Sequence, residues 1–283
     1  MRSLLLDIAS AFNNVYSGWI WWNLFLAFIP LLLSYGLFRR QAIPRGWWLG
    51  ACLLLGVVGV VGLWPRLPRV ARGWSNIVGD GGGVTQLQLL WLIVVTILAA
   101  AMSIVIFRKQ QSARGLAWWA GLVAFFAFLP NAPYVLTDII HIIRGTSSGQ
   151  IPVWVVALVF IPIHTVAIVL GFEAYVISIL NLASYLKRHG AKALILPVEL
   201  IIHGLCAVGI YLGRFLRLNS WDVVVDPASV LAETLNVLTS KRPVAVMGVT
   251  FIILASLYWL MKQITLGLKL RLHYARQGID VLD

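Results

Sequence analysis

The stretch VWVVALVFIPIHTVAIVLGFE, residues 153–173, contains no Lys, Arg or Asp, and its single Glu is the last residue. A helix needs about 20 apolar residues to cross a hydrocarbon core about 30 Å thick. The stretch has this length, and its polar residues are too few to form the solvated face of a surface helix. It therefore predicts a membrane-spanning helix.

Six further apolar stretches have similar lengths, at residues 19–38, 47–64, 88–107, 116–143, 193–213 and 243–261. The whole chain is 60% hydrophobic and 11% charged, whereas soluble domains carry about 25% charged residues. Most of the tryptophans fall near the ends of these stretches, as expected for indoles at the head-group level. We therefore predict an all-α, polytopic transmembrane helix bundle of about seven spans, which is a multi-pass protein of the cell inner (plasma) membrane.

Basic residues give the predicted orientation. The loops after the first, third, fifth and seventh spans carry more Lys and Arg than the loops on the opposite side. This bias places the N-terminus outside and the C-terminus in the cytoplasm. The net charge of +12 comes from short clusters between apolar stretches, a pattern typical of contact with the lipid bilayer and its anionic head groups. No nucleic acid partner is predicted.

Three segments flank or connect the spans. Residues 1–18 carry Ser, Asp and Asn at helical spacing opposite Leu, Ile and Phe, which predicts an amphipathic interfacial segment. Residues 214–242 form the longest outer loop. Asp226 followed by Pro227 is typical of a helix start, so the loop should contain a short surface helix. Residues 262–283 are expected to be a cytoplasmic tail.

Three stretches carry a resemblance to a known family. They are WNLFLA at 22–27, followed by Pro30; FLPNAPYVLTDIIH at 128–141; and GRFLRLNSWD at 213–222. Together they resemble an uncharacterised bacterial integral membrane family, domain-of-unknown-function family 1361, over roughly residues 19–230. The region after about residue 230 lies outside the resemblance. The resemblance implies the membrane class and marks these stretches. It supplies no mechanism, and the cofactor stays unknown.

Two prolines, Pro130 and Pro133, lie inside the long predicted span 116–143. Each removes a backbone donor and disfavours helix at the preceding residue, which predicts a broken helix at membrane depth. The freed carbonyl groups must be buried in protein or line a wet cavity, and transporter sites are often built in this way. The alternative is a structural kink whose freed groups are satisfied by Asn131 and by neighbouring helices.

Polar residues gather near the predicted outer surface. Asp138 and His141 share a helix face and could donate two metal ligands, but a metal would need a third, and only His164 or Asp222 could supply it. The alternative is a hydrated helix end with an Asp–Arg or Asp–His contact, and we predict no metal site.

Arg214 and Arg217, three residues apart, should face the same way and could clamp a phosphate, a carboxylate or a lipid head group. Alternatively, both arginines only anchor the helix at the interface. We predict that their segment approaches the Pro130–His141 segment in space. The predicted ligand-binding residues are Asn131, Tyr134, Asp138, His141, Arg214, Arg217, Asn219 and Asp222.

Four ionisable residues lie within the spans: His164, Glu173, Glu199 and His203. Such groups are costly in lipid and usually face the bundle interior or a cavity, so we predict that Glu199 and His203 point inward. Glu173 is placed near the inner end of the fifth span. Glu199 and His203, four residues apart, could relay protons; alternatively they form hydrogen bonds that fix helix packing.

Three functions remain open from the sequence. The first is binding or transport of an anionic or lipid-like ligand at the outer-face polar site. The second is a membrane-embedded, metal-assisted enzyme that uses Asp138, His141 and Asp222. The third is a structural or assembly subunit with a membrane-protein partner. Bound metal would favour the second, copurifying lipid the first, and a stable larger complex with neither the third.

Overall fold

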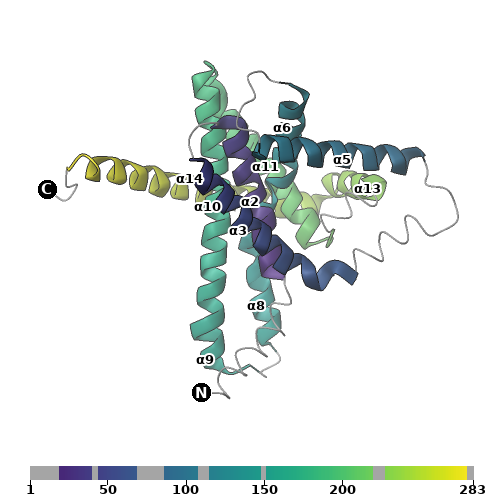
Figure 1. Ribbon diagram of the computed structural model, residues 1–283. Helices are drawn as coiled ribbons and strands as arrows, with labels where there is room; N and C mark the ends of the chain where they lie inside the picture. The colour runs from purple at the N-terminus through teal and green to yellow at the C-terminus, as the bar shows by residue number, and fades with distance from the viewer. Residues whose placement is uncertain are drawn as a thin grey trace.

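The computed structural model describes residues 19–39, 44–68, 86–107, 115–147, 151–218 and 227–278. Over these residues the chain forms helices and no strand (Figure 1). The interfacial segment predicted for residues 1–18 lies outside this described part.

Six helical segments are long and apolar enough to cross a membrane, judged by length and composition: Trp19–Phe38, Gly46–Leu63, Leu116–Ile143, Val153–Arg188, Lys192–Arg214 and Lys241–Ala275. The chain is therefore an all-helical, multi-pass membrane protein. The seventh predicted span, 88–107, lies in helix α5 (Gln86–Phe107). The side chains of this helix are described only for Ile93–Phe107, which is shorter than a membrane crossing needs. The count of seven spans therefore stays a prediction.

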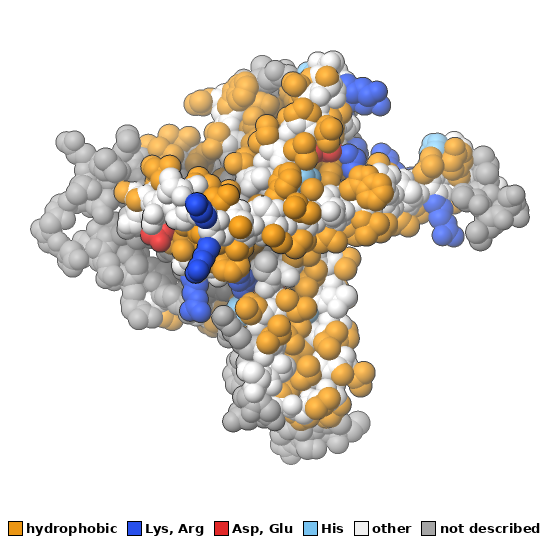
Figure 2. Space-filling model, turned by 180° about the vertical axis from the view of Figure 1, so that it is seen from behind, with side chains coloured by type: hydrophobic (Ala, Val, Ile, Leu, Met, Phe, Trp, Pro, Cys, Tyr) orange, Lys and Arg blue, Asp and Glu red, His pale blue; other side chains and the backbone are white. Residues whose placement is uncertain are grey.

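Large apolar side chains cover much of the outside of the molecule (Figure 2). Leu158, for example, is 73% exposed. A soluble monomer rarely presents a continuous apolar surface of this extent, whereas lipid tails are as apolar as these side chains. The surface therefore fits contact with acyl chains.

Helix α2 (Trp19–Phe38) is the central helix of the packing, in contact with α3 (Arg45–Leu63), α6 (Leu116–Phe128) and α10 (Ile161–Arg188). The first turn of α2 lies near the start of α10, and its last turn lies near the end of α10. The two helices therefore run in the same direction. In the last third of both helices, the Asn181 amide donates to the Ser34 hydroxyl at 2.9 Å and joins the helices inside the core.

Glycines of the series Gly56, Gly59 and Gly62 let α3 pack closely on α2. A Cβ atom at Gly62 would lie 2.5 Å from the backbone nitrogen of Trp22, and one at Gly59 would lie 2.7 Å from the Phe25 ring. Nothing lies within 4 Å of the equivalent atom at Gly56. Two of the three glycines are therefore required by packing. Leu63 is followed by a 3-10 turn, η1 (Trp64–Arg66).

The fourth span is broken, as the two prolines predicted. Its parts are α6, then α7 (Asn131–Tyr134), the 3-10 turn η2 (Val135–Asp138) and α8 (Ile139–Thr146). At the break, the Asn131 side-chain amide donates to the Phe128 carbonyl at 3.0 Å. This contact satisfies one backbone group inside the protein, as the kink interpretation expects.

The fifth span is longer than predicted. It runs from Val153 to Arg188 as α9 (Val153–Val155), a π-helical turn η3 (Val156–Phe160) and α10. The π turn ends two residues before Pro162, which cannot donate a backbone hydrogen bond. Glu173 therefore lies in the middle of α10, and its placement near the end of a span was wrong.

The helices after residue 191 differ in part from the predicted spans. A 3-10 turn, η4 (Lys192–Leu194), leads into α11 (Ile195–Arg214), and the predicted loop helix is α13 (Pro227–Leu238). Helix α14 runs from Lys241 to Ala275, so the segment expected as a tail begins inside a helix. Helices α5 and α14 run crosswise to α10 (Figure 1), unlike side-by-side spans of a simple bundle.

Orientation in the membrane is a prediction that fusions can test. The starts of α2 and α10 lie at the same end of the packing as the ends of η2 and α11, as alternating spans require. We expect reporter fusions after residues 41, 110, 190 and 275 all to read cytoplasmic, because the basic loops follow these helices. An external reading at any of these positions would contradict the N-out, C-in arrangement.

Candidate functional site

An ion pair joins the two segments that were predicted to meet. Arg214 is the last residue of α11, and Asp138 is the last residue of η2. The Arg214 Nη2 donates to Asp138 Oδ1 at 2.7 Å, with side chains 14% and 5% exposed respectively. The predicted approach is therefore confirmed for this pair. A charge-assisted bond in such a protected place is stronger than its surface equivalent.

The other guanidinium nitrogens bind the same short segment. Arg214 Nε donates to Thr137 Oγ1 at 2.9 Å, and Nη1 lies 3.2 Å from His141 Nε2. Because Arg214 can only donate, His141 accepts through Nε2 and carries its proton on Nδ1 in this arrangement. Three acceptors from one segment fix the plane of the guanidinium. We call Arg214, Thr137, Asp138, His141 and Asn23 the arginine site.

The irregular backbone explains why these acceptors converge. The 3-10 turn that ends at Asp138 has three residues per turn, and Thr137 is held by its own bond to the Tyr134 carbonyl at 2.7 Å. Glycine on α11 admits the segment, because a Cβ at Gly213 would lie 2.9 Å from the Tyr134 ring. The same ring lies under the guanidinium, with its centroid 4.5 Å from Arg214 Cζ, a cation–π contact.

Helix α2 completes the arginine site with residues that sequence reasoning missed. The Asn23 amide donates to Asp138 Oδ2 at 2.9 Å, so both carboxylate oxygens are engaged. The Trp19 ring stacks on the His141 ring with centroids 4.1 Å apart and also lies 5.4 Å from the His164 ring. In the sequence, the WNLFLA stretch that carries the family resemblance contains Asn23, and this was the only indication that α2 contributes to the site.

Several predicted residues do not join the site. Asn131 binds the Phe128 carbonyl at the helix break. Arg217 is exposed and has a φ of 57°, so the expectation that it faces the same way as Arg214 was wrong. The error arose because α11 ends at Arg214, and helical spacing does not apply beyond that residue. Asn219 and Asp222 lie outside the described residues.

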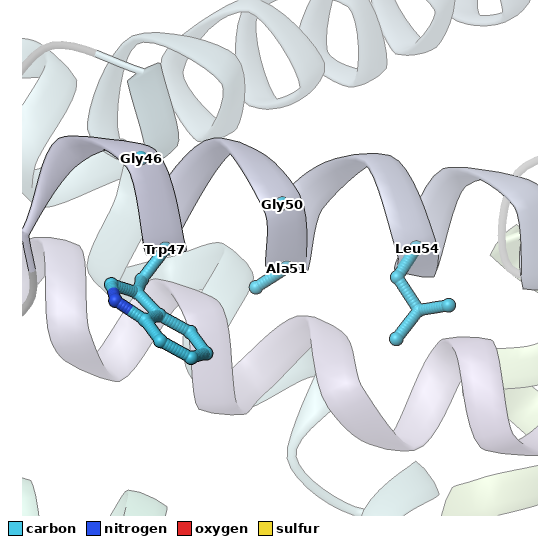
Figure 3. Close-up of a pocket in the computed structure, with 5 residues that line it drawn as sticks. All are labelled: Gly46, Trp47, Gly50, Ala51 and Leu54. Carbon is cyan, nitrogen blue, oxygen red and sulfur yellow. The ribbon is translucent and has the colours of Figure 1, made fainter.

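The arginine site is partly accessible and differs from the surface hollow on α3. His141 is 31% exposed and is the most open of its charged or ionisable groups. A separate hollow of about 570 Å³ is lined by Gly46, Trp47, Gly50, Ala51 and Leu54, all on α3 (Figure 3). None of these lining residues is charged, so the hollow offers no counterpart for an ion.

The metal-assisted interpretation has two of its three residues in place. His141 Nε2 lies 4.0 Å from Asp138 Oδ1. Within the described part of the chain, no group of three His, Cys, Asp or Glu side chains could hold a metal ion. Asp222, the third residue of that interpretation, is outside this part.

A second polar cluster lies in the interior, where α14 crosses α11. Glu199 Oε1 accepts from Tyr258 Oη and from Lys262 Nζ, both at 2.7 Å. One turn along α11, His203 Nδ1 lies 2.6 Å from Tyr175 Oη. Glu199 and His203 are both buried, so their predicted inward orientation is confirmed. Lys262 was missed, because it was assigned to the tail.

The remaining intramembrane residues lie on α10. His164 is buried, and its Nδ1 lies 3.0 Å from the Phe160 carbonyl oxygen. Glu173 meets Thr265 of α14 at 2.7 Å. Along α11, Glu199 is about 22 Å from Arg214, at a rise of about 1.5 Å per residue. The interior cluster is therefore distinct from the arginine site.

Chemically, the arginine site can receive an anion. A guanidinium has five N–H groups, and its contacts with the described residues use one on each nitrogen. One N–H therefore remains on each of the two terminal nitrogens. Two such groups in one plane match two oxygens of a phosphate or a carboxylate.

A model of one family, described as a protein of unknown function (DUF1361), matches residues 91–256. The match begins later and ends later than the resemblance over residues 19–230 suggested. It covers the broken fourth span and the end of α11, and it leaves out α2. No curated protein and no solved structure matches the chain.

Proposed function

Because the chain belongs to the DUF1361 family, whose description assigns no activity, we propose from the site itself that it binds or transports an anionic or lipid-like ligand. The ligand meets the arginine site, which the predicted orientation places at the outer face of the cell inner membrane. The observation that carries the proposal is the Arg214 guanidinium, largely buried and held in one plane by three acceptors.

Preorganisation is the physical reason for this choice. An exposed arginine must lose side-chain freedom before it can bind a ligand in a defined geometry. Arg214 has already lost that freedom in contacts with Thr137, Asp138 and His141. Its remaining N–H groups are therefore aimed before a ligand arrives. His141 and Trp19 form a stacked pair beside them.

The shared chemistry of the ligand is an oxyanion, which a lipid head group or a free anion could supply. A lipid could place its acyl chains on the apolar outer surface while its phosphate meets Arg214. A free anion would reach the same N–H groups without that apolar contact. The two sources are distinguished by adding them separately.

The test measures how much each ligand stabilises the purified protein. We expect phosphatidylglycerol in phosphatidylcholine nanodiscs, or inorganic phosphate in detergent, to raise the Tm of the native chain, because a ligand that binds only the folded state stabilises it. In Arg214→Lys, binding should weaken about ten- to hundredfold, since lysine cannot present two donors in one plane.

Arg217→Lys is the matched control, because it makes the same substitution at an exposed residue just beyond α11. It should leave the ligand-induced shift unchanged. A shift for phosphatidylglycerol alone would identify a lipid, and a shift for phosphate alone would identify a small anion. No shift with either ligand, or equal shifts in both variants, would overturn the proposal.

A structural lock is the second candidate function for the same residues. It is favoured by Asp138, whose two oxygens bind α11 through Arg214 and α2 through Asn23. The carboxylate thus ties the broken span to two other helices. If this is its only role, Arg214→Lys lowers the Tm of the protein without any effect on ligand binding. Such a lock would suit a structural or assembly subunit.

A further inference from the structure

The described residues include four side-chain carboxyl groups. Three of them are either ion-paired or exposed to solvent. Asp138 pairs with Arg214, and Glu199 pairs with Lys262. Glu233 is exposed on α13. The fourth, Glu173, lies in the middle of α10 and has no ion pair with the described residues. Its protonation state therefore has to be found from its hydrogen bonds.

The Thr265 hydroxyl group makes two short contacts that indicate the protonation state of Glu173. Its Oγ1 lies 2.7 Å from Glu173 Oε1 and 2.8 Å from the carbonyl oxygen of Met261. A threonine hydroxyl has one hydrogen to donate, and a carbonyl oxygen has none. Both contacts can be complete hydrogen bonds at once when Thr265 donates to Met261 and a protonated Glu173 carboxyl group donates to Thr265. The two distances therefore fit a protonated Glu173.

The surroundings of the second oxygen agree with this assignment. Glu173 Oε2 is buried and has no hydrogen-bond partner among the described residues. An ionised carboxylate would leave a charged oxygen unpaired inside a membrane-spanning helix, which is far more costly than an unpaired neutral carbonyl oxygen. The nearest cation along α14 is Lys262, one turn before Thr265, and it is already bound to Glu199.

We propose that Glu173, at the contact of α10 and α14, is a proton-binding site that holds a proton near neutral pH and releases it reversibly to water. Release breaks the carboxyl O–H bond, sends the proton to water and leaves a carboxylate that accepts from Thr265. The reverse step restores the acid. The proposal rests on the hydrogen count at Thr265 and does not depend on a ligand at Arg214.

Other ionisable groups near Glu173 determine the net charge of this region when Glu173 loses its proton. On α14, Lys262 and Tyr258 lie on the same helix face as Thr265, and Lys269 follows one turn later. From α11 come Glu199 and His203. On α10 itself, Tyr175 binds His203. Because Glu199 and Lys262 neutralise each other, loss of the proton leaves one uncompensated negative charge.

Infrared spectroscopy of the full chain in lipid vesicles tests the proposal directly. We expect a carbonyl stretch of a protonated carboxylic acid near neutral pH, a shift of that band in deuterium oxide, and its reversible loss as the pH is raised. Glu173→Gln should abolish the band. Glutamine matches the acid in shape and can donate its own N–H to Thr265, so the variant should fold.

Glu233→Gln and Glu199→Gln are matched controls, because the first removes an exposed carboxylate and the second an ion-paired one. Both should retain the band. Absence of the band in the native chain, its survival in Glu173→Gln, or its persistence until the protein unfolds would each overturn the proposal. So would a rise in Tm on adding NaCl that choline chloride does not reproduce and Glu173→Gln removes, since the site would then hold a cation.

Discussion

Replacing Asp138 by alanine is expected to lower the unfolding free energy by about 3–5 kcal/mol, because it leaves the Arg214 charge buried without its partner. Arginine cannot escape this cost by losing its proton. The Asn23 amide also loses its acceptor. Denaturant unfolding of the purified protein in detergent micelles measures the effect.

A double variant separates the unpaired charge from simple loss of packing. Asp138→Leu combined with Arg214→Met removes both charges and should be more stable than Asp138→Ala, since replacing a whole buried pair by apolar groups is often close to neutral. Arg217→Ala, which removes an exposed arginine, should change stability by no more than about 0.5 kcal/mol. A loss below about 1 kcal/mol for Asp138→Ala would show that the pair is solvated.

Removal of Lys262 is expected to have the next largest effect. Lys262→Met leaves Glu199 Oε1 with the Tyr258 hydroxyl as its donor, at 2.7 Å, and the free energy of unfolding should fall by about 2–3 kcal/mol near neutral pH. The loss is smaller than for Asp138→Ala because a carboxylate, unlike a guanidinium, can become neutral by taking up a proton.

Denaturant unfolding of the purified protein in detergent micelles measures the loss for Lys262→Met. Lys269→Met, which removes an exposed lysine of the same helix, is the control and should change stability by no more than about 0.5 kcal/mol. A loss below about 1 kcal/mol for Lys262→Met would show that the Glu199–Lys262 pair is solvated.

The fold class could be predicted from the sequence because length and apolar composition together determine whether a helix can cross a bilayer. The break in the fourth span was also predictable, since Pro130 and Pro133 remove backbone donors wherever they occur. The residues at which the helices end were harder to predict from the sequence. Glu173 was placed near the end of a span, yet α10 continues to Arg188, and the contact of Glu173 with Thr265 of α14 depends on tertiary packing that the sequence does not show.

The arginine site was only half visible in the sequence. Asp138 and Arg214 carry opposite charges at helix ends that alternate across the membrane, so their pairing could be predicted. Asn23 and Trp19 could not be assigned, because neither is charged and both begin an apolar helix distant in sequence. Lys262 was missed for a related reason. A lysine just after an apolar run is typical of a loop, and only the packing of α14 on α11 shows its carboxylate partner.

The central position of α2 in the packing affects which fragments of this protein could keep its internal contacts. The family match begins at residue 91, yet α2 supplies Asn23 to the Asp138 carboxylate and Ser34 to the interior amide of Asn181. A fragment limited to the matched region would lack both of these partners. The boundary of the family match therefore lies inside the packed structure and does not separate two independent parts. In the growing chain, α2 emerges before the other described helices, so Asn23 and Ser34 meet their partners only after those helices have been made.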